Sequence, residues 1–402
     1  RYFLKHKKRN FSTASIWIKG GSDMDGRDKK GINKILSSLI TRGCEGFDSF
    51  ALSQYIESYG AELNQEVYED GILISIKSLN EHFNKLLPLL DLIINKPSLS
   101  EIDFQKVKKS SIDLIKKDKE NPFNICFEKW RKIVYSSHPY AFNTIGNRND
   151  VSKITYQDVL YEFNNFKLRE KYLISNNSEI NGDDLGTVER KTIKEKSVIV
   201  SYEIDPMSRF EYSNNDSNQT IIMIGNQTCS RKSSEYLTLK VLESYLSYGM
   251  SSALFKLFRE KNGITYDLGV FNPIRSGNAP FLIYLSVSNK NALFAFKLLS
   301  SLWNNLLLKP LIDDEIFLAK EKLKGSFLLG NQSLDEILQR KVQLISYGIL
   351  PISNIDLISK IEKISASDIN KLTIKYFSKP FLSISGNKKI CLEIKNLWKK
   401  NF

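Results

Sequence analysis

The sequence predicts an α+β protein made of two homologous domains, each with a mixed or antiparallel sheet that carries helices on one face. Three observations favour this fold class. The chain has 402 residues, which exceeds the length of one ordinary domain. Short β-branched segments and longer amphipathic helical segments follow one another in mixed order, which favours an antiparallel or mixed sheet with helices on one face. The order of these segments repeats in the second half, which indicates an internal duplication.

The first half begins with a β-branched strand at Ala14–Gly20. An amphipathic helix follows within residues 31–44, then a second helix, and then an alternating strand at Gly71–Leu79. A helix with apolar residues at three-to-four spacing is predicted over Phe83–Ile94, and a lysine-rich helix comes after it.

The second half repeats this order. Its strands are predicted at Gln219–Gly225 and Phe281–Ser288, and its apolar helix at Leu293–Leu308. Lys96-Pro97 and Lys309-Pro310 each follow the apolar helix of their half and precede a short acidic turn. A shared signature at a similar position in each half supports the duplication.

Glycines mark the same repeat. Gly43 and Gly60 in the first half match Gly249 and Gly263 in the second, at similar spacing. Between the halves, residues 176–197 are rich in charge and poor in large apolar side chains, as is typical of a surface linker. We therefore predict an N-terminal domain over residues 1–180, a linker over 181–197 and a C-terminal domain over 198–402.

Composition restricts the classes of function. Hydrophobic residues make up 42% of the chain and charged residues 26%, as in a globular protein. The three histidines lie far apart, so no short His-x-x-His or His-Glu-x-x-His zinc motif can form. The four cysteines contain no Cys-x-x-Cys pair, which excludes a zinc knuckle and a thioredoxin-type site and fits buried thiols in a reducing compartment.

The net charge of +13 invites a nucleic-acid interpretation. However, lysines alternate with acids along the helical segments, and no aromatic RNA-binding motif or zinc finger is present, so we expect no nucleic-acid partner. No apolar run reaches the roughly 18 residues that span a bilayer, and the basic start of the chain does not resemble a signal peptide. The expected location is cytoplasmic and bacterial-type, with a plastid or another organelle as the alternative.

The helix within residues 31–44 is the most informative segment. Its apolar positions form one stripe that we expect to be buried: Ile32, Ile35, Leu36, Leu39 and Ile40. Four polar residues fall on the opposite face, which we interpret as solvated: Asn33, Lys34, Ser37 and Ser38.

This helix and its surroundings resemble the pitrilysin/insulinase metallopeptidase family, and most of all its branch related to the mitochondrial processing peptidase. The shared features are a strand that ends at Gly20-Gly21-Ser22, a short loop and a helix that starts at Gly31. HPYAFNTIGNRNDV, from His138, resembles the family's His-Pro-Tyr-Gly stretch. GMSSALFKLFREKNGITY, from Gly249, resembles its Gly-x-x-Ser-x-Leu-Phe-x-x-Leu-Arg-Glu-Lys-x-Gly-x-x-Tyr motif. The resemblance spans essentially the whole chain and implies the duplicated fold.

Active members of that family carry His-x-x-Glu-His on the first helix, where the histidines bind zinc and the glutamate is the general base. The corresponding positions here are Lys34, Ser37 and Ser38, so the resemblance implies no metal in this chain. The distal glutamate ligand would fall near Asp113 or Leu114, where no glutamate stands. We further hypothesise that Lys34 pairs with Asp113 in place of the metal.

The resemblance also implies a role for Arg259 and Tyr266. Active members use an arginine and a tyrosine seven residues apart to contact substrate and to stabilise the tetrahedral intermediate. Arginine offers forked donors to a carbonyl, and a phenol can donate to an oxyanion. From spacing alone, Arg259 would instead be an ordinary surface ion-pair residue and Tyr266 a half-buried strand residue.

These residues imply one half of a composite site. The chain is expected to be the zinc-free subunit of a heterodimeric zinc metallopeptidase that cleaves peptides. Zinc and base would come from a homologous partner that bears His-x-x-Glu-His. The chain lacks the long glycine-rich loop of the mitochondrial α-subunit, which favours a bacterial-type or plastid-type pair. The alternatives are a catalytically inert scaffold or core subunit of a larger complex, and an inactive homodimer.

Overall fold

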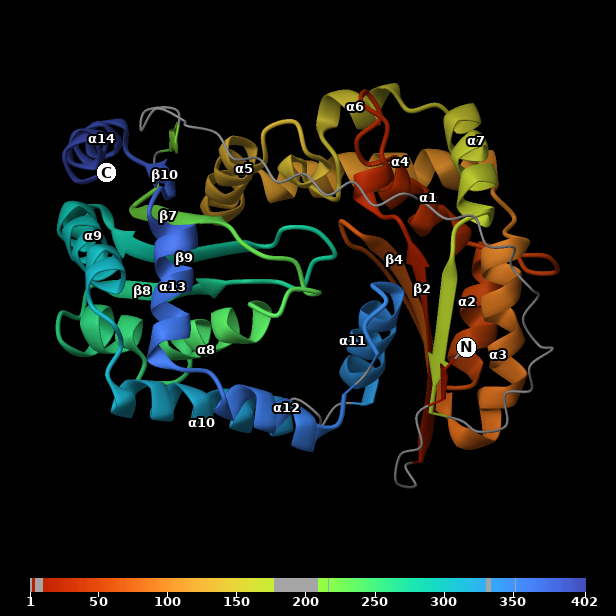
Figure 1. The fold of residues 1–402 in the computed structure, drawn as a ribbon. Coiled ribbons are helices and arrows are strands. Elements are labelled where there is room, and N and C mark those ends of the chain that lie inside the picture. Colours follow the sequence, from red (N-terminus) through yellow and green to blue (C-terminus); the bar gives the residue numbers. More distant parts are fainter. Residues whose placement is uncertain (1, 4–9, 177–208, 216, 330–333, 351) are drawn as a thin grey trace. The chain divides into compact units, whose positions relative to one another are not determined.

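The computed structural model describes residues 2–3, 10–176, 209–215, 217–329, 334–350 and 352–402 (Figure 1). The predicted linker, 181–197, lies outside these residues. Two compact units are present. Unit 1 comprises Arg1–Lys117, Phe142–Glu195 and Gly330–Pro351, and unit 2 comprises Asp118–Ala141, Lys196–Leu329 and Ile352–Phe402.

Unit 1 contains a five-stranded mixed sheet in the order β1-β5-β2-β4-β3. Its strands are β1 (Tyr2–Phe3), β2 (Phe11–Lys19), β3 (Glu62–Val67), β4 (Gly71–Leu79) and β5 (Lys171–Ser175). The β1–β5 pair is parallel, and the other three pairs are antiparallel. The β-branched residues of β2 and β4 explain why these two strands form the centre of the sheet.

Unit 2 repeats this sheet in the order β6-β10-β7-β9-β8. Its strands are β6 (Phe210–Asn214), β7 (Gln219–Gln227), β8 (Thr265–Phe271), β9 (Pro280–Ser288) and β10 (Phe381–Gly386). The β6–β10 pair is parallel and the others are antiparallel, as in unit 1. Each strand thus has a counterpart at the same place in the other sheet, which confirms the predicted duplication and the α+β class.

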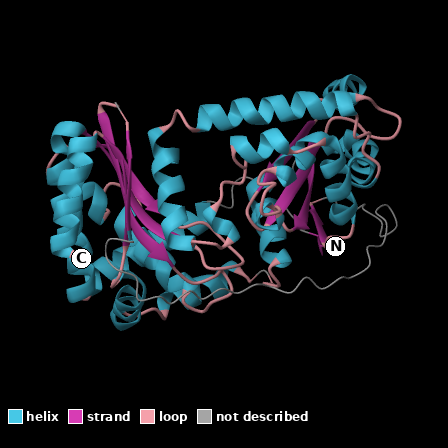
Figure 2. Ribbon diagram, turned by 90° about the horizontal axis from the view of Figure 1, so that it is seen from above, coloured by secondary structure: helices cyan, strands magenta, loops and turns pink. Residues whose placement is uncertain are grey.

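Helices cover both sheets, as Figure 2 shows for each sheet viewed from above. Unit 1 contains α1 (Ile32–Ile40), α2 (Ser49–Ser58), α3 (Asn80–Asn95), α4 (Glu101–Asp118), α6 (Arg148–Lys153), α7 (Tyr156–Lys167) and α11 (Leu334–Ser346). Unit 2 contains α5 (Pro122–Tyr135), α8 (Tyr236–Ser247), α9 (Ala292–Leu308), α10 (Asp313–Leu329), α12 (Asn354–Glu362), α13 (Ala366–Phe377) and α14 (Lys388–Asn401).

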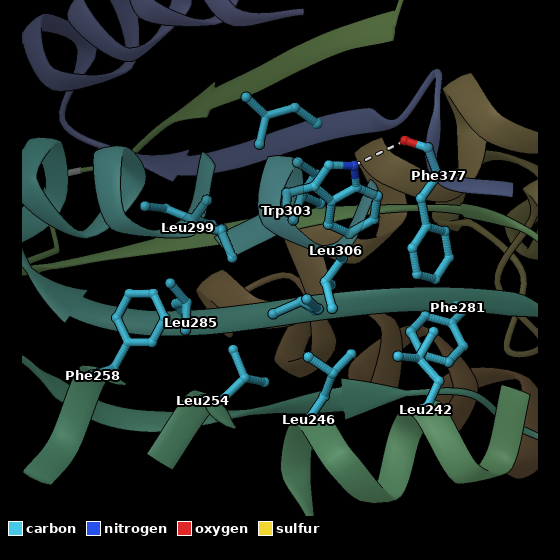
Figure 3. Close-up of a cluster of buried hydrophobic side chains, with 14 of the residues drawn as sticks. Leu242, Leu246, Leu254, Phe258, Phe281, Leu285, Leu299, Trp303, Leu306 and Phe377 are labelled. Atoms are coloured by element: carbon cyan, nitrogen blue, oxygen red, sulfur yellow. Dashed lines mark hydrogen bonds between the residues drawn. The ribbon is translucent and has the colours of Figure 1, made fainter. Parts of the chain in front are cut away.

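The core of each unit lies between its sheet and the main helical layer. In unit 1 the predicted apolar stripe of α1 is buried in full, with every member at 3% exposure or less. In unit 2, Trp303 of α9 packs toward the sheet with Leu299 and Leu306, and its indole N–H donates to the Phe377 carbonyl over 2.9 Å (Figure 3). Burial of these large side chains is the main force that holds the helices on the sheet.

The second face of each sheet is covered by a helix from the other half of the chain. Helix α5 precedes the middle of the sequence but packs on β6, β7 and β10 of unit 2. Helix α11 lies late in the sequence but packs on β2 and β5 of unit 1 (Figure 1). The compact units therefore do not correspond to a single cut in the chain, because each half donates one helix to the other half's sheet.

The donated helices occupy equivalent positions. Tyr135, at the end of α5, donates its hydroxyl hydrogen to the carbonyl of Asn278 over 2.9 Å. Tyr347, directly after α11, donates to the carboxylate of Asp70, also over 2.9 Å. Asp70 lies in the connection between β3 and β4, and Asn278 lies in the equivalent connection between β8 and β9. In each unit, a tyrosine hydroxyl thus attaches the donated helix to the corresponding hairpin.

No helix in the described part of the chain combines the length and hydrophobicity that crossing a bilayer requires.

Candidate functional site

The start of α1 is held by a buried polar network. Gly31 precedes the helix with φ +100° and has no side chain that could cap it. Asp25 supplies the cap from the preceding loop, accepting from the backbone N–H groups of Gly31 (2.6 Å) and Asn33 (3.1 Å). The Asn33 amide also donates to Asp25, and the Arg169 guanidinium donates to the Asn33 side-chain oxygen. These contacts fix the position and rotation of α1.

Two carboxyl groups in the loop before α1 have raised pKa values. Burial raises the pKa of Asp25 to about 6, although its three hydrogen bonds oppose the shift. Burial also raises the pKa of Asp23 to about 7, and the neighbouring Asp70 carboxylate adds to this increase. The loop before α1 therefore carries two carboxyl groups whose charge changes between about pH 6 and 7.

Lys34, Ser37 and Ser38, the three positions that the resemblance aligns with the zinc motif, lie on one face of α1. Gln65 of β3 links two of them, because the Ser37 hydroxyl donates to its side-chain oxygen over 3.0 Å. Its side-chain nitrogen in turn donates to the Ser38 hydroxyl over 3.2 Å. Burial lowers the pKa of Lys34, and the nearby Glu66 carboxylate opposes that shift.

Two expectations for this face are wrong. It is not a solvated face, because Ser37 and Asn33 are fully buried, at 0% exposure. Strand β3 and the Asp25 network cover these side chains, which a helical pattern alone does not reveal. Lys34 also forms no ion pair with Asp113 among the described residues. Asp113 is exposed on α4, and the charge that acts on Lys34 is that of Glu66.

These residues do not fit a zinc ion. Zinc in proteins is bound by thiolate, imidazole or carboxylate groups. The α1 face instead offers one ammonium group and two hydroxyls that already bond to Gln65. Within the described ranges, no group of three or more histidine, cysteine, aspartate or glutamate side chains is arranged to hold a metal. The donor chemistry of this face therefore opposes a zinc-dependent step carried out by this chain alone.

Arg259 of unit 2 lies on an irregular helix. Residues Phe255–Glu260 form a π-helical turn, a geometry that is rare and frequent at functional sites. The Arg259 side chain is exposed, and its guanidinium lies 5.5 Å from the centre of the Phe255 ring. Across the described part of the chain it forms no ion pair, so the interpretation of Arg259 as a surface ion-pair residue is wrong.

Tyr266 lies at a bulge in the edge strand β8. Thr265 pairs with Val287 and Asp267 pairs with Ser286, so Tyr266 is the extra residue between two register positions. The Thr265 hydroxyl donates to the Asp267 carbonyl over 2.9 Å and to the Ser286 carbonyl over 3.0 Å, which stabilises the bulge. A bulge redirects side chains, and Tyr266 is 65% exposed rather than half-buried as a regular strand residue would be.

A short, well-bonded connection joins these two residues. Gly263 adopts φ +58°, and its N–H donates to the Arg259 carbonyl over 3.1 Å. The Asn262 amide donates to the Leu257 carbonyl over 2.7 Å. Among the described residues, no hydrogen bond or ring contact joins the side chains of Arg259 and Tyr266. In the part of the chain that the structure describes, the Arg259 guanidinium and the Tyr266 hydroxyl have no hydrogen-bond partner, so both can donate to a ligand.

Some site residues could not be identified from the sequence. Gln65 carries no motif, and only the pairing of β3 with β4 places it against α1. Asp25 and Arg169 lie far apart along the chain and meet through Asn33. The sequence offered one signal for Asp25. A helix that begins at a glycine needs a cap from elsewhere, and Asp25 is an acid that lies shortly before it.

The expectation of buried thiols is confirmed. All four cysteines are free and buried, and burial raises the pKa of Cys126 to about 12. His138 acts as a local cap, because its Nδ1 accepts from the Tyr140 backbone N–H over 3.2 Å. Neither residue type contributes to the candidate site.

Two units with one strand order define a duplicated, two-domain α+β protein. Family models for both halves match the chain. Residues 1–148 match insulinase (peptidase family M16), and residues 171–323 match the peptidase M16 inactive domain. The chain therefore belongs to the pitrilysin/insulinase family, M16.

Curated relatives cover most of the chain. An uncharacterized zinc protease of Rickettsia felis is 22% identical, over 80% of this chain and 78% of its own length. The non-peptidase homolog YmxG of Helicobacter pylori is 20% identical, over 88% of this chain and 83% of its own. Relatives of similar sequence identity thus carry names with opposite implications for catalysis.

Solved structures share the fold. The peptidase M16 inactive domain from Pseudomonas fluorescens superimposes with a TM-score of 0.82 at 20% identity, covering 96% of this chain and 95% of that one. A protease from Helicobacter pylori superimposes with a TM-score of 0.80 at 16% identity, covering 94% of both chains. At this level of identity the likeness establishes the architecture alone.

Proposed function

We propose that this chain is a zinc-free subunit of a heterodimeric zinc metallopeptidase of the M16 family. One observation carries the proposal. Arg259 and Tyr266 are exposed on a π-helical turn and a β-bulge, and their donor groups have no hydrogen-bond partner among the described residues. The resemblance aligns Lys34, Ser37 and Ser38 with the zinc motif, which supports the zinc-free role. Irregular elements cost regular hydrogen bonds, and they commonly occur where a side chain must be aimed at a ligand.

In this proposal the chain binds and orients a peptide. The substrate adds as an extended strand at a sheet edge, where main-chain groups are available for pairing. The Arg259 guanidinium donates to a substrate carbonyl, and the Tyr266 hydroxyl donates to the oxyanion of the tetrahedral intermediate. A homologous subunit with His-x-x-Glu-His supplies zinc, which activates water, and the general base. The proposed location of the pair is cytoplasmic.

The first test is isolation of the native complex with this chain as bait. We expect a homologous protein of similar size that bears His-x-x-Glu-His, with about one zinc per pair. The isolated pair should cleave peptides, and this chain alone should not. Recovery of a single chain, or of a homodimer, with no peptidase activity would contradict the proposal.

Variants then test the two residues in the reconstituted pair. Arg259→Ala should lower kcat about 100-fold or more, because removal of one transition-state donor commonly has this effect. Arg259→Lys keeps the positive charge but lacks the forked donors, so its kcat should lie between those of the wild type and of Arg259→Ala. Lys256→Ala removes an exposed cation from the same π-helical turn and is the matched control. Unchanged turnover in Arg259→Ala would show that the pair does not use this side chain.

Tyr266→Phe removes only the hydroxyl from the bulge. We expect a fall in kcat of about 100-fold, with KM changed little, because the hydroxyl acts on the intermediate and not on the bound peptide. Tyr161→Phe, at a tyrosine of unit 1 that is 70% exposed, is the matched control.

The second candidate is an inert scaffold. The name of the Helicobacter pylori relative, a non-peptidase homolog, favours it. A scaffold would assemble into a larger complex, and neither Arg259→Ala nor Tyr266→Phe would alter any proteolysis in that complex.

A further inference from the structure

The outer helical layer of unit 2 presents an unusual surface. Helix α9 packs against both α13 and α14, and all three helices contact the sheet. The inward side of α9 is apolar and buried, as Figure 3 shows for Leu299, Trp303 and Leu306. The opposite sides of the three helices are exposed to solvent. We call these exposed sides the lysine face.

Positive charge dominates the lysine face. Helix α14 carries five lysines and one glutamate, α13 carries two lysines and one aspartate, and α9 carries one lysine and no acid. Six of these lysines are exposed and, among the described residues, form no ion pair: Lys297, Lys371, Lys388, Lys389, Lys399 and Lys400. Lys375, by contrast, is bonded to Glu235. Unpaired cations gathered on one face attract an anionic partner.

The duplication provides an internal control for this charge. Helices α3 and α7 occupy the places of α9 and α13 in unit 1 and derive from the same chain composition. They carry two lysines against four acids: Lys85, Lys167, Glu81, Asp91, Asp158 and Glu162. A general lysine bias would enrich both layers equally. The lysine face is therefore a local property of unit 2.

Exposed apolar residues lie among these lysines. Phe294 and Leu308 on α9 are 47% and 78% exposed, and Ile374 on α13 is 52% exposed. On α14, Leu392 is 39% exposed and follows Lys388 and Lys389 by one helical turn. Residues three or four apart share one face of a helix, so Leu392 points the same way as these lysines.

We propose that the lysine face binds the surface of an anionic membrane. Lysines attract acidic lipid headgroups, and apolar side chains between them enter the boundary between headgroups and acyl chains. A nucleic acid fits less well, because α9, α13 and α14 contain no arginine for bidentate phosphate contacts and place aliphatic groups among the cations. This binding is independent of the proposed peptidase role.

The test is co-sedimentation of the full chain with lipid vesicles. Vesicles of phosphatidylcholine with about one-third phosphatidylglycerol should bind the chain, and vesicles of phosphatidylcholine alone should not, with binding lost at high salt. Changing four lysines of α14 to glutamate, at 388, 389, 399 and 400, should lower the partition coefficient at least about tenfold. Leu392→Ala should lower it by a smaller factor, of about two to five.

A matched control makes the same charge change at the C-terminal end of α4, outside the lysine face. Lys109, Lys116, Lys117 and Lys119 are exposed on or just after α4, and their change to glutamate should leave vesicle binding near the wild-type value. If the α14 glutamate variant does not fold, the same four positions changed to glutamine replace it. No binding to anionic vesicles, or equal losses in both variants, would overturn the proposal. Binding to DNA or RNA oligonucleotides without binding to vesicles would also overturn it.

Discussion

The two donated helices occupy equivalent places in the two units, but different forces hold them there. Helix α5 is held by apolar burial. Cys126 and Trp130 are fully buried, and the indole N–H of Trp130 donates to the Phe381 carbonyl over 3.2 Å. Helix α11 is held to a larger extent by charge. Its Asp335 accepts from the Thr13 hydroxyl over 2.7 Å and pairs with Lys77 over 2.9 Å.

The difference follows from the strands beneath each helix. Under α5, strand β7 presents Ile221 and Met223, which are buried and apolar. Under α11, strand β2 presents the polar Thr13 and Ser15 beside Trp17, whose ring lies against Tyr347. One topology therefore accommodates two kinds of interface, and the strand residues facing the helix decide which one forms. The comparison predicts that unit 2 depends on packing and that unit 1 depends on polar contacts and on pH.

The largest effect is expected for Trp130→Ala in α5. Removal of a fully buried indole leaves a large cavity and should lower the free energy of unfolding by about 3–5 kcal/mol. Val342 occupies a similar place in α11 and is also fully buried. Val342→Ala should cost less, about 1–2 kcal/mol, because a smaller volume is lost. Urea unfolding measures both values, and equal costs would contradict the contrast between the helices.

The two tyrosine hydroxyls give a closer comparison. Tyr347→Phe removes a hydrogen bond to the Asp70 carboxylate and should cost about 1.5–3 kcal/mol. Tyr135→Phe removes a hydrogen bond to a neutral carbonyl and should cost about 0.5–1.5 kcal/mol. Each change keeps the ring in place, so thermal unfolding of the two variants isolates the hydroxyl. A larger loss of stability in Tyr135→Phe than in Tyr347→Phe would contradict the view that polar contacts hold the donated helix mainly in unit 1.

A smaller effect is expected for Asp335→Ala. The change leaves the buried Thr13 hydroxyl without this acceptor and removes the partly exposed ion pair with Lys77, for a loss of about 1 kcal/mol. Glu336→Ala changes an exposed acid next to it and should have no measurable effect. Equal unfolding midpoints for the two variants would show that Asp335 does not hold α11.

The smallest effect concerns pH. The pKa of Asp23 is about 7 in the folded chain, above the ordinary value of 3.8, so the folded state binds more protons than the unfolded state between these values. Stability contributed by protonated Asp23 is complete below pH 3.8 and is lost as the pH rises toward 7. Asp23→Asn should therefore raise stability at pH 8, on the order of 1 kcal/mol, and leave it unchanged at pH 4.

Unit 2 supplies the control for this pH effect. The hairpin turn that carries Asp70 in unit 1 carries the neutral Asn278 in unit 2. Asn278→Ala should therefore shift stability equally at both pH values. A pH-independent effect of Asp23→Asn would contradict a raised pKa at this site.

Much of the fold could be predicted because it depends on local patterns. The strand predicted at Gly71–Leu79 has those bounds in the structure, and the apolar stripe of α1 is buried as expected. The glycine match needs one correction. Gly46 and Gly249, with φ +85° and +74°, form the equivalent pair, at the same sequence distance as Gly60 and Gly263. Gly43 has no positive φ and lies close to Ser98 and Phe47, whereas Gly46 is open, and the sequence displays neither difference.

The candidate site could be predicted only in part. Arg259 and Tyr266 followed from a motif, but no pattern indicated the π-helical turn or the bulge, since both depend on register with β9 and on the backbone bonds around them. The link between Ser37 and Gln65 was equally hidden, because a strand 28 residues away provides it.

The sequence alone determined the fold class and the duplication, because periodicity and residue identity are properties of each segment by itself. Only the tertiary structure decided that each half gives one helix to the other sheet, that α1 has no solvated polar face, and that the lysines of α14 gather with exposed apolar residues. These features depend on which segments meet across long sequence distances. Hydrophobic burial selects such contacts for the chain as a whole, and no single segment specifies them.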